Sequence, residues 1–342
     1  MSHLQKIIAR IADGHALDRA EARDAFRLIM DGAAEDVEIA AFLMGLKMRG
    51  ETVAEIAGGA DVMRANALPL QAPPGTVDTC GTGGDGLGTY NISTAAAIVA
   101  AAAGVPVAKH GNRAVSSLSG SSDVLAHLGV AMDAPLDRVQ GALDRFGLCF
   151  LLAPRHHEAM RHVALVRKSL GVRTIFNILG PLTNPAGAKR QLIGVYDQRW
   201  LKPLAETLGL LGSEHVWVVH GHDGLDELSI STESSVVSFR NGKLEEMTIR
   251  PEDFGLKRHP LEALKGGDAA YNAAALRDLL MGQPSAYRDV VALNAGAALM
   301  LGGGAADVAA GVAMAQNAID SGKALALLND WAAYSRGETA DV

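Results

Sequence analysis

The first 70 residues carry hydrophobic side chains at helical spacing. Leu4, Ile7 and Ile11 recur every three or four residues, which places them on one face of a helix. Two later segments begin with a capping box, in which a polar side chain and a Glu three residues on close the first turn: Asp18 with Glu21, and Thr52 with Glu55. The stretch at residues 68–75, rich in Pro and ending in Gly, cannot continue a helix, and we expect it to lead into a second domain.

From residue 77 the pattern changes to short apolar runs separated by helical segments. These runs predict strands at residues 77–80, 105–108, 148–153, 191–196 and 215–220. Strands that alternate with helices favour a mostly parallel sheet covered by helices. Asn241 and Gly242 separate two further runs and predict a hairpin over residues 236–249, which adds an antiparallel element at the sheet edge. Helical patterns return from residue 268.

Length and charge narrow the class of protein. The 342 residues exceed the size at which one hydrophobic core usually stops growing, so we expect two domains. A net charge of −7 argues against a general nucleic-acid binder, because binding to nucleic-acid phosphates requires a basic surface. An anionic substrate must therefore be met by local donors or together with a metal.

The cysteines and the N-terminus suggest a location. Cys80 and Cys149 are too few for a disulfide framework and lack the spacing of a zinc site. The first residues carry charges and a Gly where a signal peptide needs an apolar stretch, and no uncharged apolar run reaches about 18 residues. We therefore expect a cytoplasmic protein with no membrane partner.

A glycine-rich loop follows the first predicted strand. Five glycines fall within residues 81–88, and an alanine-rich helix is predicted to begin near Ser93. Glycines let backbone N–H groups turn toward an anion, and a helix N-terminus adds donors and partial positive charge. An ordinary turn needs only one or two glycines. The loop therefore predicts a phosphate or pyrophosphate site.

Two common phosphate motifs do not explain this loop. Gly81, Gly83 and Gly86 satisfy the dinucleotide pattern, but that pattern expects an acidic residue about 20 positions later, at the end of the second strand. Here the second strand ends in Lys109, and the next acidic residue is Asp123. The loop also lacks the Gly-Lys-Ser/Thr sequence of a P-loop. A phosphate site of another kind remains.

A second polar segment follows the next strand. It begins with Lys109, His110, Gly111, Asn112 and Arg113 and continues with several serines: Ser116, Ser117, Ser119, Ser121 and Ser122. At the carboxyl edge of a parallel sheet these residues would supply a cation, an amide and hydroxyl donors beside the glycine loop. A solvated serine-rich loop is the alternative, and His110 alone fits a structural hydrogen bond as well as catalysis.

Adjacent carboxylates follow the strand predicted at residues 215–220. Mg²⁺ takes oxygen ligands such as Asp226 and Glu227 when it also binds substrate phosphates. Taken alone, an acidic turn is more typical of solvated surface, but its combination with a pyrophosphate loop favours a metal site.

The histidine-rich segment at residues 155–162 does not form a zinc-peptidase motif. His157 and His162 are five positions apart, whereas HExxH needs histidines four apart on one helical face. We predict that this segment is a helix that continues through Arg167 to Arg173, and that it offers a guanidinium able to hold a carboxylate.

Several motifs occur in the order found in one enzyme family. DTCGTGGDGLGTYNIST, AKHGNRAVSSLSGSSDVLAHLG, VRKSLGVRTIFNILGPLTNPA, HGHDGLDELS and NAGAAL all resemble the anthranilate phosphoribosyltransferases, which act in tryptophan biosynthesis. The resemblance extends from the helical N-terminus past residue 320. It implies transfer of the phosphoribosyl group from phosphoribosyl pyrophosphate (PRPP) to the amine of anthranilate, giving N-(5-phosphoribosyl)anthranilate and pyrophosphate.

The resemblance also implies a domain organisation. A small all-helical domain would comprise residues 1–72 and a returning segment at about 165–187. A larger α/β domain with a mostly parallel central sheet, of the nucleoside phosphorylase and phosphoribosyltransferase type, would comprise residues 73–164 and 188–342. The family further implies a homodimer with contacts through the helical domain.

The residues that the resemblance assigns to PRPP are Gly81, Gly84, Asp85, Thr89, Asn91, Ile92, Ser93, Thr94, Lys109, His110, Gly111, Asn112, Arg113, Ala114, Val115, Ser116, Ser117 and Ser121. Anthranilate would contact Gly81, Asn112 and Arg167. Two Mg²⁺ ions are implied, one bound by Ser93 and the other by Asp226 and Glu227. No single catalytic acid or base is assigned, because an arylamine is uncharged at pH 7 and its proton becomes acidic only as the new bond forms.

Some positions depart from the family pattern, and three alternative functions remain. Leu118 stands where Lys is frequent, Glu158 and Leu165 where Pro is common, and Tyr271 where Glu is frequent. A phosphoribosyltransferase for another aromatic acid stays open. A non-catalytic relative that binds nucleic acid is opposed by the net charge and the acidic pair, and a pyrimidine nucleoside phosphorylase by its different first loop, Lys-His-Ser-Thr-Gly-Gly.

Overall fold

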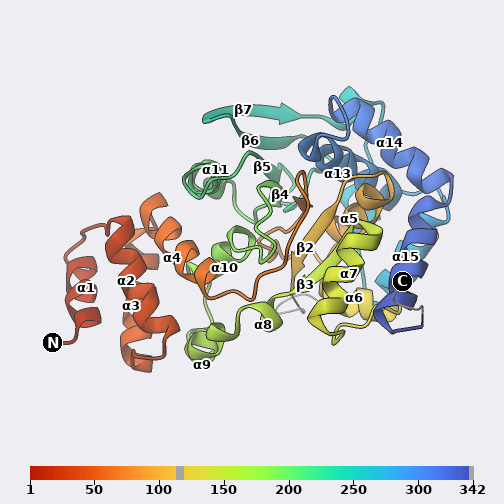
Figure 1. Ribbon diagram of the computed structural model, residues 1–342. Coiled ribbons are helices and arrows are strands. Elements are labelled where there is room, and N and C mark those ends of the chain that lie inside the picture. Colours follow the sequence, from red (N-terminus) through yellow and green to blue (C-terminus); the bar gives the residue numbers. More distant parts are fainter. Residues whose placement is uncertain (113–118, 339–342) are drawn as a thin grey trace.

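The computed structural model describes residues 1–112 and 119–338 (Figure 1). The N-terminal helices are α1 (His3–Ala12), α2 (Arg19–Met30), α3 (Asp36–Arg49) and α4 (Val53–Ala65). The predicted capping boxes open α2 and α4, so these predictions are confirmed. The apolar faces pack on one another, with the rings of Phe26 and Phe42 edge to face at 5.5 Å between centroids.

A seven-stranded sheet forms the centre of the described residues beyond these helices. Its strands are β1 (Val77–Asp78), β2 (Val107–Gly111), β3 (Leu148–Leu152), β4 (Arg190–Gly194), β5 (His215–Gly221), β6 (Ser234–Arg240) and β7 (Lys243–Ile249). The spatial order is β3-β2-β1-β4-β5-β6-β7, in which β1 to β5 are parallel and β6 and β7 antiparallel. The mostly parallel sheet and the edge hairpin were both predicted.

The hairpin turn has the expected backbone. Asn241 and Gly242 both adopt positive φ, 51° and 76°, as the mirror-image turn that joins twisted antiparallel strands requires. The exposed side chains of β7 include Lys243, Glu245 and Glu246. Such a charged edge opposes pairing with another strand.

Helices cover both faces of the sheet. On one face, α5 (Ile92–Ala102) and α13 (Ala286–Gly302) pack on apolar strand residues such as Leu192 and Val219. On the other face, α11 (Leu201–Leu210) packs on residues such as Ile193 and Val218, and this core continues into the N-terminal helices (Figure 1). Alternate residues of β4 therefore enter two different cores, as the pleat of a strand requires. The outer helices are α6 (Ser121–His127), α7 (Leu136–Phe146), α12 (Ala269–Leu280), α14 (Val308–Asp320) and α15 (Lys323–Ser335).

The segment after β3 differs from its prediction as one helix over residues 155–173. It consists of α8 (Ala153–His156), a 3-10 turn, α9 (Arg161–Leu170) and α10 (Phe176–Leu179). His157 leaves helical backbone geometry at the first break, and Gly171 ends α9 in the left-handed conformation. The helix α9 packs on α2 and α3, and α10 packs on α4.

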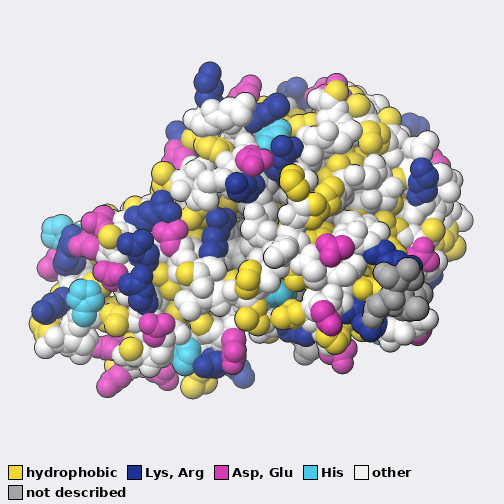
Figure 2. Space-filling view, viewed as in Figure 1, with side chains coloured by type: hydrophobic (Ala, Val, Ile, Leu, Met, Phe, Trp, Pro, Cys, Tyr) yellow, Lys and Arg dark blue, Asp and Glu magenta, His cyan; other side chains and the backbone are white. Residues whose placement is uncertain are grey.

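Acidic and basic side chains are interspersed over the N-terminal helices on the face shown in Figure 2. Over residues 1–112 and 119–338, every helix is too short or too polar to cross a membrane.

Candidate active site

The glycine loop between β1 and α5 owes its course to glycine backbone. Gly83, Gly84, Gly86 and Gly88 have φ between 64° and 80°, a conformation that side-chain-bearing residues rarely adopt. The loop is anchored where the Thr82 N–H donates to the carbonyl oxygen of Gly194 at 2.8 Å. The glycine-rich turn that the sequence predicts is therefore present between β1 and α5.

Lys109 connects this loop to the start of α5. Only 3% of Lys109 is exposed, and its Nζ donates to the Thr79 carbonyl at 2.9 Å and to Ser93 Oγ at 3.2 Å. Ser93 lies in the first turn of α5, where backbone N–H groups have no helical acceptor. A buried cation and a helix N-terminus thus meet at one point, which is a favourable environment for an anion.

The acidic pair reaches the same point from the other side. The Ser93 N–H donates to Glu227 Oε1 at 3.0 Å. Burial raises the pKa of Glu227 to about 7, although Lys109 and Ser93 oppose that shift. Burial, together with the neighbouring charges of Asp85 and Glu227, also raises the pKa of Asp226 well above its usual range. A cation bound here would relieve this accumulation of negative charge.

The chemistry of these donors fits a hard divalent cation. Carboxylate and hydroxyl oxygens from Asp226, Glu227 and Ser93 are ligands that Mg²⁺ accepts. The described residues contain no group of three or more His, Cys, Asp or Glu side chains arranged to bind a metal. A Mg²⁺ ion at this site would therefore complete its coordination with water or substrate phosphates, which is its usual behaviour.

Close backbone approach explains two of the glycines. A Cβ added at Gly81 would lie 3.2 Å from Asp226 Oδ2, and one at Gly194 would lie 1.5 Å from the Asp226 carbonyl oxygen. The acidic turn therefore rests directly on β4 and on the beginning of the glycine loop. The site depends on the absence of side chains at these two positions.

Arg167 lies on α9, and its guanidinium has no hydrogen-bond or ion-pair partner among the described residues. Its Cζ is 5.4 Å from the centroid of the Phe176 ring, and burial lowers its pKa. Among residues 1–112 and 119–338 no hydrogen bond or ion pair satisfies this group. A partly buried, unpaired guanidinium is well suited to bind a carboxylate.

The other residues assigned from the sequence fall into three groups. Ile92 and Thr94 are buried in the first turn of α5, Thr89 pairs with Lys265, and Asp85 accepts a hydrogen bond from the Leu87 N–H. Gly111 and Ser121 lie side by side, since a Cβ added at Gly111 would be 3.6 Å from the Cβ of Ser121. The next residue of each segment is also in contact, because the Ser122 N–H donates to the Asn112 carbonyl. Arg113, Ala114, Val115, Ser116 and Ser117, like Leu118, lie outside the described residues.

The ring of His110 is buried in a structural environment. Its Nδ1 lies 3.2 Å from the Gly180 carbonyl oxygen, and its centroid is 5.2 Å from that of His157. Burial and the neighbouring His157 lower the pKa of His110 to about 3, so the ring is neutral near pH 7. His110 therefore joins the strand end to the segment that follows α10.

Sequence analysis did not identify several residues that hold the site. Thr79 accepts from Lys109 through its carbonyl, Arg173 contacts Gly84, and Asn272 contacts Asn91. No motif connects these partners, because they meet only in the folded chain.

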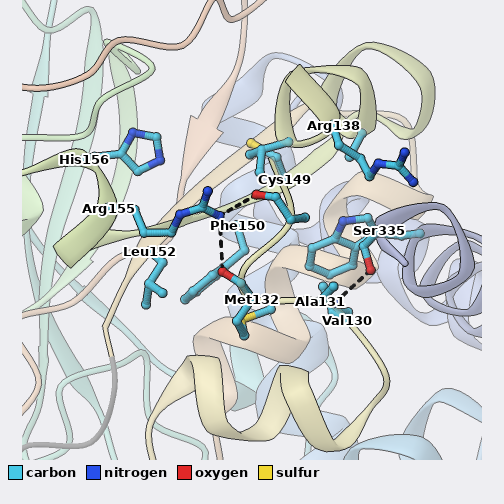
Figure 3. A pocket seen from close by; sticks show the side chains of 14 residues that line it. Val130, Ala131, Met132, Arg138, Cys149, Phe150, Leu152, Arg155, His156 and Ser335 are labelled. Carbon is cyan, nitrogen blue, oxygen red and sulfur yellow. Dashed lines mark hydrogen bonds between the residues drawn. The ribbon is translucent and has the colours of Figure 1, made fainter. Parts of the chain in front are cut away.

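The cavity shown in Figure 3 lies apart from this site. Its volume of about 20 Å³ holds no more than one water. Arg155 Nη1 donates to the Met132 carbonyl at 3.3 Å and also to the Ala134 carbonyl, while Ser335 Oγ accepts from the Ala131 N–H at 2.8 Å. These contacts fasten α8 and α15 to the loop before α7, and they indicate a structural role.

Comparison with known proteins agrees with this geometry. A model of the glycosyl transferase family α/β domain matches residues 73–325, and a model of that family's helical bundle domain matches residues 5–67. Fold and site thus define a glycosyl transferase built from a helical bundle and an α/β domain.

Full-length relatives give the particular family. The anthranilate phosphoribosyltransferase of Parvibaculum lavamentivorans is 53% identical over 99% of both chains, and that of Azospirillum brasilense is 55% identical over 96% of this chain and 92% of its own. The crystal structure of the Thermus thermophilus enzyme has a TM-score of 0.92 at 47% identity, covering 98% of this chain and 100% of that one. The Saccharomyces cerevisiae enzyme in complex with PRPP and Mg has a TM-score of 0.88 at 28% identity, covering 98% of each chain. The chain belongs to the anthranilate phosphoribosyltransferase family, as its motifs predicted.

Proposed function

We propose that this chain transfers the phosphoribosyl group of PRPP to the amine of anthranilate, as a step of tryptophan biosynthesis. The observation that carries the proposal is the meeting of Lys109 and Glu227 at Ser93, on the first turn of α5 and beside the glycine loop. That arrangement offers cationic and N–H donors to a pyrophosphate and carboxylates to its metal. Relatives named for this activity match 96% to 99% of the chain.

The pyrophosphate end of PRPP is proposed to lie over the glycine loop and the N-terminus of α5. Mg²⁺ would screen the charge of the departing pyrophosphate, with Ser93 proposed to hold one ion and Asp226 and Glu227 the other. We propose two ions, as the family resemblance implies. Lys109 would oppose the negative charge that accumulates on the leaving group.

Anthranilate is proposed to bind between the glycine loop and α9. Arg167 would pair with its carboxylate, Asn112 would contact it, and Gly81 would mark the meeting point of the two substrates. Catalysis would then rest on holding the neutral amine against the ribose carbon as pyrophosphate leaves, which requires no strong base. Domain limits at residues 72, 165 and 187, a homodimer that uses the helical domain, and a cytoplasmic location are part of the same proposal.

The test follows anthranilate fluorescence with purified protein, PRPP and Mg²⁺. We expect fluorescence to fall only when all three are present, and to fall more slowly for Asp226→Ala/Glu227→Ala. Glu245→Ala/Glu246→Ala is the matched control, because it removes two adjacent exposed carboxylates from the edge strand β7. A flat trace for the wild type would exclude anthranilate as acceptor and would direct the search to other aromatic acids.

A further inference from the structure

The segment between the glycine loop and α5 is fastened to the beginning of α12. The Gly266 N–H donates to the Gly88 carbonyl at 2.9 Å, and the Tyr90 N–H donates to the Leu264 carbonyl at 3.0 Å. The Tyr287 hydroxyl donates to the Asn91 carbonyl at 3.1 Å. The backbone that carries Asn91 into the site is therefore fixed by residues more than 170 positions later in the chain.

One hydrogen bond determines which way the Asn272 amide faces. The Gly267 N–H lies 2.8 Å from one atom of that amide. A backbone N–H can only donate, so the atom facing it must be the oxygen, Oδ1. Asn272 is 2% exposed, so water does not compete for these hydrogen bonds. The other amide atom is consequently the nitrogen.

The orientation of Asn272 then determines that of Asn91. Asn272 Nδ2 lies 3.0 Å from the Asn91 amide. Because an amide nitrogen is a donor, the Asn91 atom that faces it must be the oxygen. Asn91 Nδ2 is left facing away, and no hydrogen bond joins it to any residue within 1–112 or 119–338. Asn91 is half-buried and directly precedes α5.

We propose that Asn272 is a positioning residue whose amide makes Asn91 present a donor, rather than an acceptor, to the phosphorylated substrate. This inference rests on the proposed function, in which PRPP lies at the start of α5. With Asn91 reversed, two NH₂ groups would oppose each other in a buried contact, and a carbonyl oxygen would face an anion. Both changes are unfavourable.

Asn272→Asp tests, with almost no change in side-chain size, whether the amide of Asn272 determines the orientation of the Asn91 amide. One Asp oxygen still accepts from the Gly267 N–H, but the other is now an acceptor, so Asn91 must turn its nitrogen toward residue 272. We expect calorimetry with PRPP and Mg²⁺ to show binding weakened about tenfold or more, as expected for the loss of a hydrogen bond to a charged group. The KM for anthranilate should change little, whereas the melting temperature should fall, because the new carboxylate is buried without a cationic partner.

Two further variants separate positioning from a simple charge effect. Asn329→Asp makes the same chemical change on the exposed surface of α15 and should leave PRPP binding unchanged. In an Asn91→Ala background, Asn272→Asp should cause no further loss of PRPP binding, whereas repulsion by the new carboxylate would persist. Persistence of the full loss in that background would overturn the inference, as would wild-type binding by Asn272→Asp alone.

The outcomes also separate this inference from the proposed function. If the wild-type protein binds PRPP but consumes no anthranilate, anthranilate is excluded as the acceptor. Weakened PRPP binding by Asn272→Asp would still support the role of Asn272 in that case. A wild type that binds no PRPP would overturn both. A variant whose two KM values rise together would show a merely structural role and would overturn the inference.

Discussion

The guanidinium of Arg173 donates from Nη2 to the carbonyl oxygen of Gly84 at 2.6 Å, and its Cζ lies 4.1 Å from the centroid of the Tyr196 ring. Arg173 follows α9 by three residues, whereas Gly84 lies in the glycine loop. This hydrogen bond therefore joins the segment after α9, the helix that carries Arg167, to the glycine loop, which is proposed to bind PRPP. Stacking on Tyr196 holds the planar group in place.

Replacement of Arg173 by Lys is expected to raise the KM for PRPP roughly five- to thirtyfold, because Lys keeps the charge but loses both the planar stack and the fork of donors. Steady-state kinetics at saturating anthranilate measure this effect. Arg199→Lys is the matched control, since that guanidinium also stacks on an aromatic ring, 5.0 Å from the centroid of Trp200, but has no contact with the loop. Equal KM values for Arg173→Lys and the wild type would contradict a role in holding the loop.

A methyl group at Gly194 is expected to displace the acidic turn. Its Cβ would lie 1.5 Å from the Asp226 carbonyl oxygen, so β4 or the turn must move. We expect Gly194→Ala to lose at least about 2 kcal/mol of unfolding free energy, as overpacked sites do, together with its response to Mg²⁺. Gly180→Ala is the stability control, because its Cβ would meet nothing within 4 Å. Urea unfolding of both variants makes the comparison, and equal midpoints would contradict the tight contact.

Two glutamates fill the same capping-box position in different surroundings. Glu55 is fully buried, pairs with Arg49, and accepts from the Leu17 and Thr52 N–H groups, each at 2.9 Å. Glu21 is partly exposed and closes the box at Asp18. Glu55→Ala is expected to cost about 3 kcal/mol, because it leaves the buried Leu17 N–H without an acceptor and removes the carboxylate that pairs with the partly buried Arg49. Glu21→Ala should cost about 1 kcal/mol or less. Similar shifts in the denaturant midpoint would show that burial does not matter here.

The buried histidines predict how stability depends on pH. Burial and the neighbouring His156 lower the pKa of His157 from 6.5 to about 4. Between those values the unfolded chain binds a proton that the folded chain does not, so folded stability falls as the pH decreases from 6.5 toward 4, by roughly 1.4 kcal/mol per pH unit for such a group.

His157→Gln is expected to flatten this slope. His127→Gln should leave it unchanged, because His127 is exposed. Melting temperatures measured from pH 7 to pH 4.5 test the difference. The same slope in His157→Gln as in the wild type would show that His157 does not contribute to acid sensitivity.

Local patterns predicted the elements better than their limits. The turn at Asn241 and Gly242 and the capping boxes at Asp18 and Thr52 depend on neighbours in the chain, and all were predicted. The first strand was predicted over residues 77–80, but β1 ends at Asp78. The carbonyl of Thr79 accepts from Lys109 Nζ instead of continuing the sheet, and that partner lies 30 residues away.

In the candidate site, too, local sequence predicted some features, whereas contacts between distant residues were not predicted. The glycine spacing, Lys109 and the acidic pair were found from the sequence, because each lies in or after the carboxyl half of a strand, at the same edge of a parallel sheet. Whether they bind PRPP and Mg²⁺ stays a prediction. The helix break at His157 could not be predicted, because that ring is buried against His110 by tertiary packing. Asn272 was missed because its partner, Asn91, is 181 residues distant and neither residue lies in a motif shared with the other.

The position of β1 within the sheet has a consequence for synthesis on the ribosome. Val77 pairs with Val107 on one side and with Arg190 on the other, and the Tyr287 hydroxyl donates to the carbonyl of Asn91. A nascent chain that ends before residue 190 lacks one neighbouring strand of β1, and one that ends before residue 287 still lacks the hydrogen bond from Tyr287 to Asn91. The contacts among α1 to α4, such as those of α2 with α4 and of α1 with α3, are by contrast local and become available early. We therefore expect the anion site to be among the last parts of the molecule to acquire its native shape, after most of the chain has left the exit tunnel.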